Sequence, residues 1–346
     1  MKKIIHNDHN LNDSDINNVV KRAKLLIIND KDEFLMAKTF DCYHILGGHV
    51  ENDENDEKTI ERELMEEAGI NLSLPKLVPF LSIRYYTKDY PTGKNTLFIN
   101  NYYSYSGNLS PNFDKMNLTK DEKTWDFVPT YVKSYKALDM LKECYEVCKN
   151  KNVLNDTIDA LNEYFNGVSL YTPKLDDYWY EKKLDMDPKT MEYNRGYDIK
   201  NPYYNYDDGT IIFNEDRWKE MHDRRKNNNE FFAYIKTNSD KKYVGTCNYK
   251  YDKESNRYEC GVVIQHSKRG NGYSKLALQL LCNHAFNNGV DELYDNFELD
   301  RKEALNLFLS VGFKVDKQTK WKKFGKDVDG VVVKIEKQDF YRKLYE

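Results

Sequence analysis

One stretch in the first half of the chain, from Gly48 to Ile70, constrains the fold more than any other. Its regularly spaced charged residues and glycines are Gly48, Glu54, Arg62, Glu63, Glu66, Glu67 and Gly69. A helix over about 57–68, turning about 100° per residue, gathers the three later glutamates into one acidic arc. An apolar stripe of Ile60, Leu64 and Ala68 lies beside that arc, and Gly69 ends the helix. Such a helix packs on a sheet and holds three carboxylates at the edge of a cleft.

Three neighbouring carboxylates repel one another and raise one another's pKa unless a cation neutralises them. Hard oxygen ligands on a rigid helix are what Mg²⁺ or Mn²⁺ binds. Arg62 is spaced to pair with Glu54 and hold the preceding loop, while Gly48 leaves room for a metal or a phosphate to approach the backbone. Taken alone, the glutamates would also suit an exposed acidic helix decorated with charge pairs. The complete spacing favours a metal site.

The stretch resembles the Nudix box, G-x5-E-x7-R-E-U-x-E-E-x-G-U with U aliphatic, at every defined position. The resemblance implies an α/β/α sandwich over about residues 1–165. It also implies Mg²⁺-dependent (or Mn²⁺-dependent) hydrolysis of a nucleoside diphosphate linked to another group. Glu63 and Glu67 match the main metal ligands, to which Glu66 and the backbone of Gly48 add, and these three glutamates are the expected catalytic residues. Glu54 and Arg62 match the structural pair, and the catalytic base is left open.

The sequence offers one weak indication of the substrate. Tyr86 lies near the position at which dinucleoside-polyphosphate hydrolases carry a tyrosine, which makes it a candidate for stacking on the substrate. The alternative is that Tyr85 and Tyr86 belong to the face of a strand, expected over Leu81–Thr87.

A glycine loop marks the second half. A strand over Arg257–Ile264 leads into Arg269-Gly270-Asn271-Gly272, and an apolar helix follows up to Asn287. The two glycines allow successive backbone N–H groups to face one anion at the positive end of the helix. The alternative is an ordinary glycine turn, since Lys275 stands where a dinucleotide-binding fingerprint needs a third glycine.

A second segment, Ala304–Phe313, resembles the A-x-x-L-[YF]-x-x-x-G-F segment of GNAT acetyltransferases, and the glycine loop resembles their coenzyme A motif. The pair implies a mixed sheet flanked by helices over 174–346, after a linker at 166–173. It implies acetyl transfer from acetyl-CoA to a small amine, with Glu259 as base. The implied cofactor-binding residues are Val262, Val263, Ile264, Arg269, Gly270, Asn271, Gly272, Tyr273 and Ser274, and the acceptor-pocket candidates are Tyr193, Asn194 and Arg195.

Two departures from the GNAT pattern leave activity of this half open. Phe308 stands where many members carry the tyrosine that protonates the departing thiolate, and Arg301 replaces an asparagine. One hypothesis is therefore a bifunctional enzyme. The other is an active hydrolase with a non-catalytic module that binds coenzyme A or a nucleotide and regulates it.

Composition agrees with two α+β domains without a polyanion partner. At roughly 150 residues per domain, 346 residues suit two domains. The 53 basic and 57 acidic residues leave a net charge of −4, so we expect neither nucleic acid nor membrane as partner. No apolar run has the length of a membrane span and no signal peptide is visible, which predicts a cytoplasmic protein. Cys144 and Cys148, one helical turn apart, suit reduced helix cysteines better than a metal or redox site.

Overall fold

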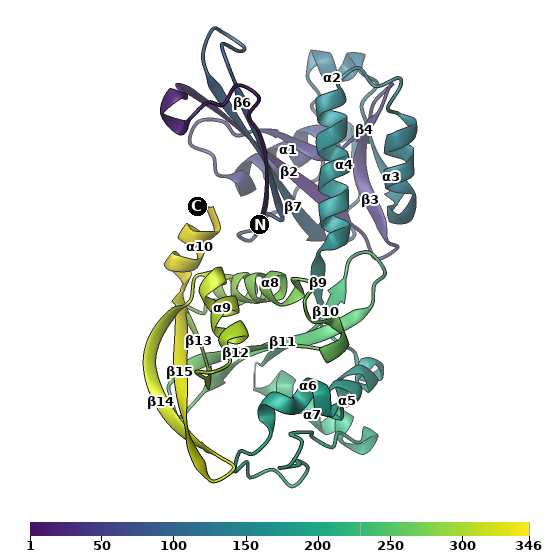
Figure 1. The fold of residues 1–346 in the computed structure, drawn as a ribbon. Helices are drawn as coiled ribbons and strands as arrows, with labels where there is room; N and C mark the ends of the chain where they lie inside the picture. Colours follow the sequence, from purple (N-terminus) through teal and green to yellow (C-terminus); the bar gives the residue numbers. More distant parts are fainter. Residues whose placement is uncertain (229, 346) are drawn as a thin grey trace. The chain divides into compact units, whose positions relative to one another are not determined.

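The computed structural model of the chain describes residues 1–228 and 230–345 and divides into two compact units, Met1–Phe165 and Asn166–Glu346 (Figure 1). Each unit is built around its own mixed sheet, of eight strands in the first and seven in the second. The predicted class, α+β in two domains, is confirmed. None of the helices in the described ranges combines the length and apolar character that crossing a membrane requires.

The sheet of the first unit has the order β1-β6-β7-β2-β3-β4, with β5 added to β2 and β8 added to β3. Its strands are β1 (Lys2–His6), β2 (Asn18–Ile28), β3 (Glu33–Lys38), β4 (Tyr43–His44), β5 (Leu46–His49), β6 (Leu81–Thr87), β7 (Thr96–Ser106) and β8 (Val128–Lys133). The central strand β2 runs parallel to β7 along its whole length. Both faces of β2 are covered, which explains why its end, Leu25–Ile28, is continuously apolar.

Helices cover both faces of this sheet (Figure 1). Leu25 and Ile27 pack with the apolar stripe of α1 (Asp56–Ala68), on what we call the α1 face. Leu26 and Ile28 point the other way and pack with residues of α3 (Ser134–Glu143) and α4 (Lys151–Asn166), on the α4 face. A short helix, α2 (Lys120–Thr124), precedes β8. This is the expected α/β/α sandwich, and the alternation along each strand decides which side chains reach which face.

Helix α1 begins and ends where its sequence predicts. The Asn55 side chain accepts a hydrogen bond from the Lys58 amide at 2.9 Å and caps the first turn. Gly69 adopts the left-handed conformation (φ 62°) that ends the last turn. Ile60, Leu64 and Ala68 are all buried, which confirms the predicted stripe.

The sheet of the second unit has the order β14-β15-β13-β12-β11-β10-β9. Its strands are β9 (Val168–Tyr171), β10 (Phe231–Thr237), β11 (Tyr243–Asp252), β12 (Arg257–Ile264), β13 (Glu292–Glu298), β14 (Lys314–Lys323) and β15 (Lys326–Glu336). Its helices are α5 (Trp179–Asp185), α6 (Pro188–Met191), α7 (Trp218–Asn227), α8 (Tyr273–Asn287), α9 (Lys302–Val311) and α10 (Lys337–Tyr345). Helices α8 and α9 lie over one face of this sheet and α5–α7 over the other (Figure 1).

Part of the segment expected as a linker, 166–173, is a strand. Val168–Tyr171 forms β9 and pairs antiparallel with β10, from Thr237 opposite Val168 to Tyr234 opposite Tyr171. Gly167 and Pro173, which suggest a break in the chain, therefore bracket a short strand. Val168 is buried in this strand. The pairing of the four-residue segment with β10 is not visible from the local turn residues.

Candidate catalytic sites

The acidic arc of α1 lies beside the glycine pair of β5. Glu67 is 7% exposed, and its Oε2 accepts a hydrogen bond from the Gly47 amide at 2.8 Å. Burial, reinforced by the charge of Glu63, raises the pKa of Glu67 to about 8. Burial also raises the pKa of Glu63. Both carboxylates are therefore held where a nearby cation would stabilise their ionised forms.

Arg62 connects the helix to the loop before it. Its Nε lies 2.9 Å from Oε1 of Glu54, and its Nη2 donates to the carbonyl of His49 at 2.9 Å. The guanidinium holds the pKa of Glu54 at about 2. The predicted Glu54–Arg62 pair is present. The same guanidinium also reaches Glu63 at 2.8 Å and Glu66 at 3.2 Å, which the spacing did not predict.

Gly48 makes room for a carboxylate. A Cβ at this position would overlap the carboxylate of Glu63. The space that we expected a metal or phosphate to use is thus the space that lets Glu63 lie against the backbone of β5.

The donors suit a hard divalent cation by their chemistry. Glu63, Glu66 and Glu67 offer carboxylate oxygens only, and two of them have pKa values raised by burial that a cation would lower again. Within the described ranges, no three acidic, histidine or cysteine side chains converge closely enough to form a ready metal cage. Instead, the Arg62 guanidinium supplies the positive charge beside Glu63 and Glu66.

In the second unit, β12 and β13 separate along their length. The strands run parallel but pair only at Tyr258 with Leu293 and Glu259 with Tyr294. On its other side β12 pairs with β11 throughout, up to Ile264. The β13 side of Val262–Ile264 is therefore the open edge of a notch in the sheet. The resemblance to GNAT enzymes predicts an extended cofactor arm at these residues.

The glycine loop leads from this notch into α8. Gly270 (φ 82°) and Gly272 (φ 75°) adopt left-handed conformations, and a Cβ at either would meet no atom within 4 Å. The backbone conformation and not crowding requires glycine here. Gly272 directly precedes Tyr273 and Ser274, the first residues of α8, whose amides form the positive end of the helix.

Two of the predicted cofactor-binding side chains are engaged within the protein. The Arg269 guanidinium donates to the carbonyl of Ile264 at 3.3 Å and to that of Thr190 at 3.0 Å. Asn271 donates to the carbonyls of Lys268 and Arg269 at 3.1 and 3.2 Å. Both side chains stabilise the loop through these bonds. The groups that the loop offers to an anion are therefore its backbone amides.

Glu259 stands at the closed end of the notch. Its Oε1 accepts a hydrogen bond from Asn296 at 3.3 Å, and its Oε2 lies 3.2 Å from the Lys250 ammonium. Phe308, by contrast, is 4% exposed and packs its ring 5.4 Å from that of Phe297. It is a core residue that carries no proton donor.

The three acceptor-pocket candidates have different surroundings. Tyr193 lies under the Arg301 guanidinium, 5.0 Å from the centre of its ring, and burial raises its pKa to about 12. Asn194 donates to the carbonyl of Gly209 at 3.2 Å, and Arg195 lies 3.6 Å from Glu192. The structure therefore brings Tyr193 to the start of α9 and uses Asn194 to hold its own loop.

Comparison with known families decides what these two sites belong to. The NUDIX domain family matches residues 20–129, and the acetyltransferase (GNAT) family matches residues 193–313. The chain is a Nudix domain followed by a GNAT domain. No curated protein matches the chain.

Solved structures similar to this chain include two bacterial acetyltransferases. One is spermidine N-acetyltransferase from Vibrio cholerae in complex with CoA and spermine, at 13% identity and a TM-score of 0.42, covering 50% of this chain and 98% of its own. Another is an N-acetyltransferase from Staphylococcus aureus Mu50, at 17% identity and a TM-score of 0.39, covering 49% of this chain and 98% of its own.

Each domain contains a carboxylate that the sequence did not indicate. In the Nudix domain, the charge of Glu122 on α2 raises the pKa of both Glu63 and Glu67, so a fourth carboxylate lies within electrostatic reach of α1. The Thr119–Glu122 capping box could have located helix α2, though not its proximity to α1.

In the GNAT domain, burial raises the pKa of Asp295 to about 8, next to Glu259 and Arg301. Asp295 is one of three acids in β13, with Glu292 and Glu298, so the sequence had no signal that singled it out.

Tyr86 lies on the opposite face of β6 from Tyr85. Its hydroxyl donates to Asp13 at 2.7 Å, whereas Tyr85 donates to Asp156 on α4. The hydroxyl of Tyr86 is therefore engaged by Asp13, and the stacking of Tyr86 on a substrate stays a prediction.

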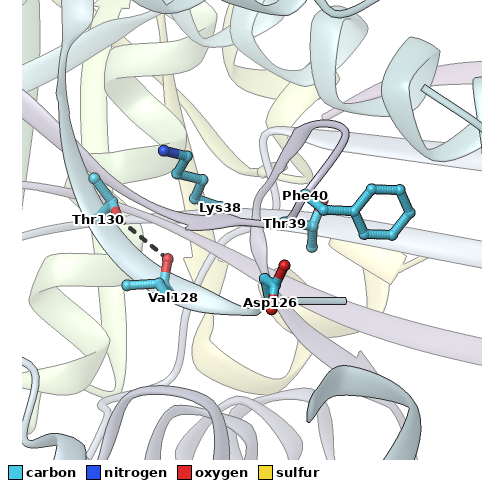
Figure 2. A pocket seen from close by; sticks show the side chains of 6 residues that line it. All are labelled: Lys38, Thr39, Phe40, Asp126, Val128 and Thr130. Atoms are coloured by element: carbon cyan, nitrogen blue, oxygen red, sulfur yellow. Dashed lines mark hydrogen bonds between the residues drawn. The ribbon is translucent and has the colours of Figure 1, made fainter. Parts of the chain in front are cut away.

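The Nudix domain also has a pocket of about 530 Å³ at the edge of its sheet, where β3 meets β8 (Figure 2). It is lined by Lys38, Thr39, Phe40, Asp126, Val128 and Thr130. None of the predicted site residues lines it.

Proposed function

We propose that the Nudix domain hydrolyses the pyrophosphate bond of a nucleoside diphosphate linked to another group, with Mg²⁺ or Mn²⁺. One observation supports this above the rest. Glu63 and Glu67 are held side by side and largely buried, the first by the absence of a side chain at Gly48 and the second by the Gly47 amide. An exposed acidic helix would not bury its carboxylates at such a cost.

In this proposal Glu63, Glu66 and Glu67 hold the cation, which when bound neutralises the pyrophosphate and activates a water. The Gly47 amide orients the Glu67 carboxylate, and Arg62 holds the Glu54 loop against the helix. The Lys24 ammonium, within electrostatic reach of Glu67 and Glu63, stabilises negative charge on the departing phosphate. Glu122 is a candidate to accept the proton of the attacking water.

The test is a screen of the full chain with Mg²⁺ or Mn²⁺, with products identified by mass spectrometry. The panel contains dinucleoside polyphosphates, nucleotide sugars, ADP-ribose, NADH, coenzyme A and oxidised nucleoside triphosphates. We expect cleavage at a pyrophosphate bond in at least one class, dependent on the cation. No product from any of them with either cation would overturn the proposal.

For the GNAT domain we propose binding of acetyl-CoA, with the pyrophosphate at the amides of Gly272–Ser274 and the pantetheine arm along Val262–Ile264. The open edge of β12 and the left-handed glycines support it. Glu259, which would accept the proton of an amine, favours acetyl transfer. The burial of Phe308 favours the second function, a non-catalytic module that regulates the hydrolase.

Two measurements separate these functions. Calorimetry of the full chain with acetyl-CoA tests the cofactor site, and absence of heat would reject it. Release of coenzyme A in the presence of a panel of small amines tests the transfer. Binding without transfer, together with a change in hydrolase rate when acetyl-CoA is added, would establish the regulatory module.

A further inference from the structure

We propose that Cys42 and Cys144 of the Nudix domain form a reversible disulfide bond by exchange with a small disulfide such as oxidised glutathione. The inference is independent of the proposed hydrolysis and of acetyl-CoA binding. The spacing of Cys144 and Cys148 alone favours reduced cysteines, because it does not reveal that a third cysteine lies beside them.

Two segments of the first unit, the loop between β3 and β4 and the turn between α3 and α4, are held together by polar contacts. Oδ2 of Asp41 accepts a hydrogen bond from the Lys149 amide at 2.9 Å, across 108 positions of sequence. The Lys149 ammonium lies 4.8 Å from the centre of the Phe40 ring. Cys42 directly follows Asp41, and Cys148 directly precedes Lys149. The contacts that join the segments therefore also bring the cysteines together.

Three thiols meet at this place. The thiol of Cys42 lies within hydrogen-bonding reach of the thiols of both Cys144 and Cys148. All three side chains belong to the same hydrophobic cluster on the α4 face. The Cys148 amide donates to the carbonyl of Cys144 at 2.9 Å, so those two residues lie one helical turn apart. Cys42 is the member that comes from a distant part of the chain.

The three thiols differ in their access to solvent. Cys42 is 2% exposed, and its thiol donates to the carbonyl of Tyr43 at 3.5 Å. Cys148 is 3% exposed, and its thiol donates to the carbonyl of Asn150 at 3.6 Å. Cys144 is partly exposed. A reagent from solution therefore reaches Cys144 first, and Cys42 is a buried thiol in contact with it.

A metal site is the other arrangement that three thiols suggest. Within residues 1–228 and 230–345, no three cysteine, histidine or acidic side chains are placed to hold a metal ion. The chemistry that remains for these thiols joins them in pairs.

The other three cysteines of the chain provide an internal comparison in the GNAT domain. Cys247, Cys260 and Cys282 also lie within electrostatic reach of one another. Each is at most 2% exposed, so this group has no member at the surface. A reagent in solution has no entry to it while the chain is folded.

The exchange takes place in two steps, each of which forms one S–S bond and breaks another. The thiolate of Cys144 attacks a sulfur of oxidised glutathione, which forms a mixed disulfide and releases one glutathione. The thiolate of Cys42 then attacks the Cys144 sulfur, which forms the protein disulfide and releases the second glutathione. The two protein thiols lose two electrons and two protons, which the two released glutathione molecules carry.

Burial makes the first step slow. It raises the pKa of the thiols of Cys42 and Cys144, so the reactive thiolate is scarce at neutral pH. The second step is intramolecular and starts from side chains already in contact, which gives the attacking thiol a high effective concentration. The bond is therefore measured at equilibrium and not by its rate of formation.

The test equilibrates the full chain in a glutathione redox buffer with a large excess of the oxidised form. Free thiols are then alkylated under denaturing conditions, and the digest is analysed by mass spectrometry. We expect two of the six cysteines to escape alkylation and to appear as a linked peptide pair that contains Cys42 and Cys144, and dithiothreitol should reverse both changes. Six free thiols, a bond that joins any other pair, or glutathione retained on Cys144 would overturn the inference.

A matched pair of variants tests the order of the steps. The double variant Cys42→Ser with Cys148→Ser removes both thiols near Cys144, so glutathione should remain attached to Cys144. Cys148→Ser alone is the control and should still form the bond between Cys42 and Cys144. In both variants serine keeps a hydroxyl donor for the backbone carbonyl that the thiol contacts. Loss of the bond in the control, or no glutathione on Cys144 in the double variant, contradicts the inference. If the double variant does not fold, the control and the wild-type peptide map still decide.

Discussion

At the scale of single residues, the glutamates of the Nudix site are positioned by two glycines and an arginine. The Gly47 amide holds Glu67, the absent side chain of Gly48 admits Glu63, and Arg62 holds the loop. The two glycines act on different carboxylates, Gly47 on Glu67 and Gly48 on Glu63, so their roles can be separated by substitution.

Removing the charge of Glu67 should abolish hydrolysis and leave the fold intact. Glu67→Gln keeps the shape and the acceptor for the Gly47 amide but loses the ionised ligand, so we expect the turnover number to fall at least about a hundredfold. Glu61→Gln is the control on the same helix, since Glu61 contacts Lys58 and the Leu74 amide and not the acidic arc. Undiminished turnover by the Glu67 variant would refute the assignment of α1.

Alanine substitutions at the two glycines of β5 should have different effects, one mainly on hydrolysis and the other mainly on stability. In Gly48→Ala the new methyl displaces only the flexible end of Glu63, so the free energy of unfolding changes by less than about 1 kcal/mol while hydrolysis falls about tenfold or more. In Gly47→Ala the methyl overlaps the backbone carbonyl of Ala23 and φ is 123°, so the fold should lose more than about 2 kcal/mol. Thermal melts and rates measured on both variants check this, and similar stability losses in the two would contradict it.

At the scale of elements, the glycines at the two ends of α8 allow an effect on acetyl-CoA binding to be separated from an effect on stability. Gly272 before the helix and Gly289 after it both have left-handed φ, 75° and 85°, with open space around a would-be Cβ. Alanine at either position should cost about 1 kcal/mol of stability. Only Gly272→Ala disturbs the backbone amides at the positive end of the helix, so only it should weaken acetyl-CoA binding, by about tenfold in calorimetry. Equal effects of the two variants on affinity would remove the loop from the cofactor site.

At the scale of the whole molecule, the two candidate sites draw on separate parts of the chain. Glu63, Glu66 and Glu67 belong to the unit ending at Phe165, and the glycine loop belongs to the unit that follows. Chelating divalent metal with EDTA should therefore abolish hydrolysis and leave the affinity for acetyl-CoA unchanged within about twofold. A large loss of acetyl-CoA affinity on chelation, restored by Mg²⁺, would show that the cofactor site needs the metal as well.

The sequence by itself determined the local parts of both sites. The cap, the stripe and the stop of α1 lie within sixteen residues, and the strand, loop and helix around Gly270 and Gly272 are also continuous. Periodicity and turn chemistry act over such distances, so the spacing was enough to predict two families and the α1 carboxylates. The Glu54–Arg62 pair was found for the same reason.

The tertiary structure alone decided which distant side chains meet. Asp41 and Lys149, which share a hydrogen bond, are 108 residues apart in sequence, and Glu122 reaches α1 from another loop. The pairing of β6 and β7 with β1 and β2 decided that Tyr85, and not Tyr86, turns toward α4. A strand shows its alternation locally but not which of its faces a helix will cover, because that choice is made by packing between segments far apart in the chain.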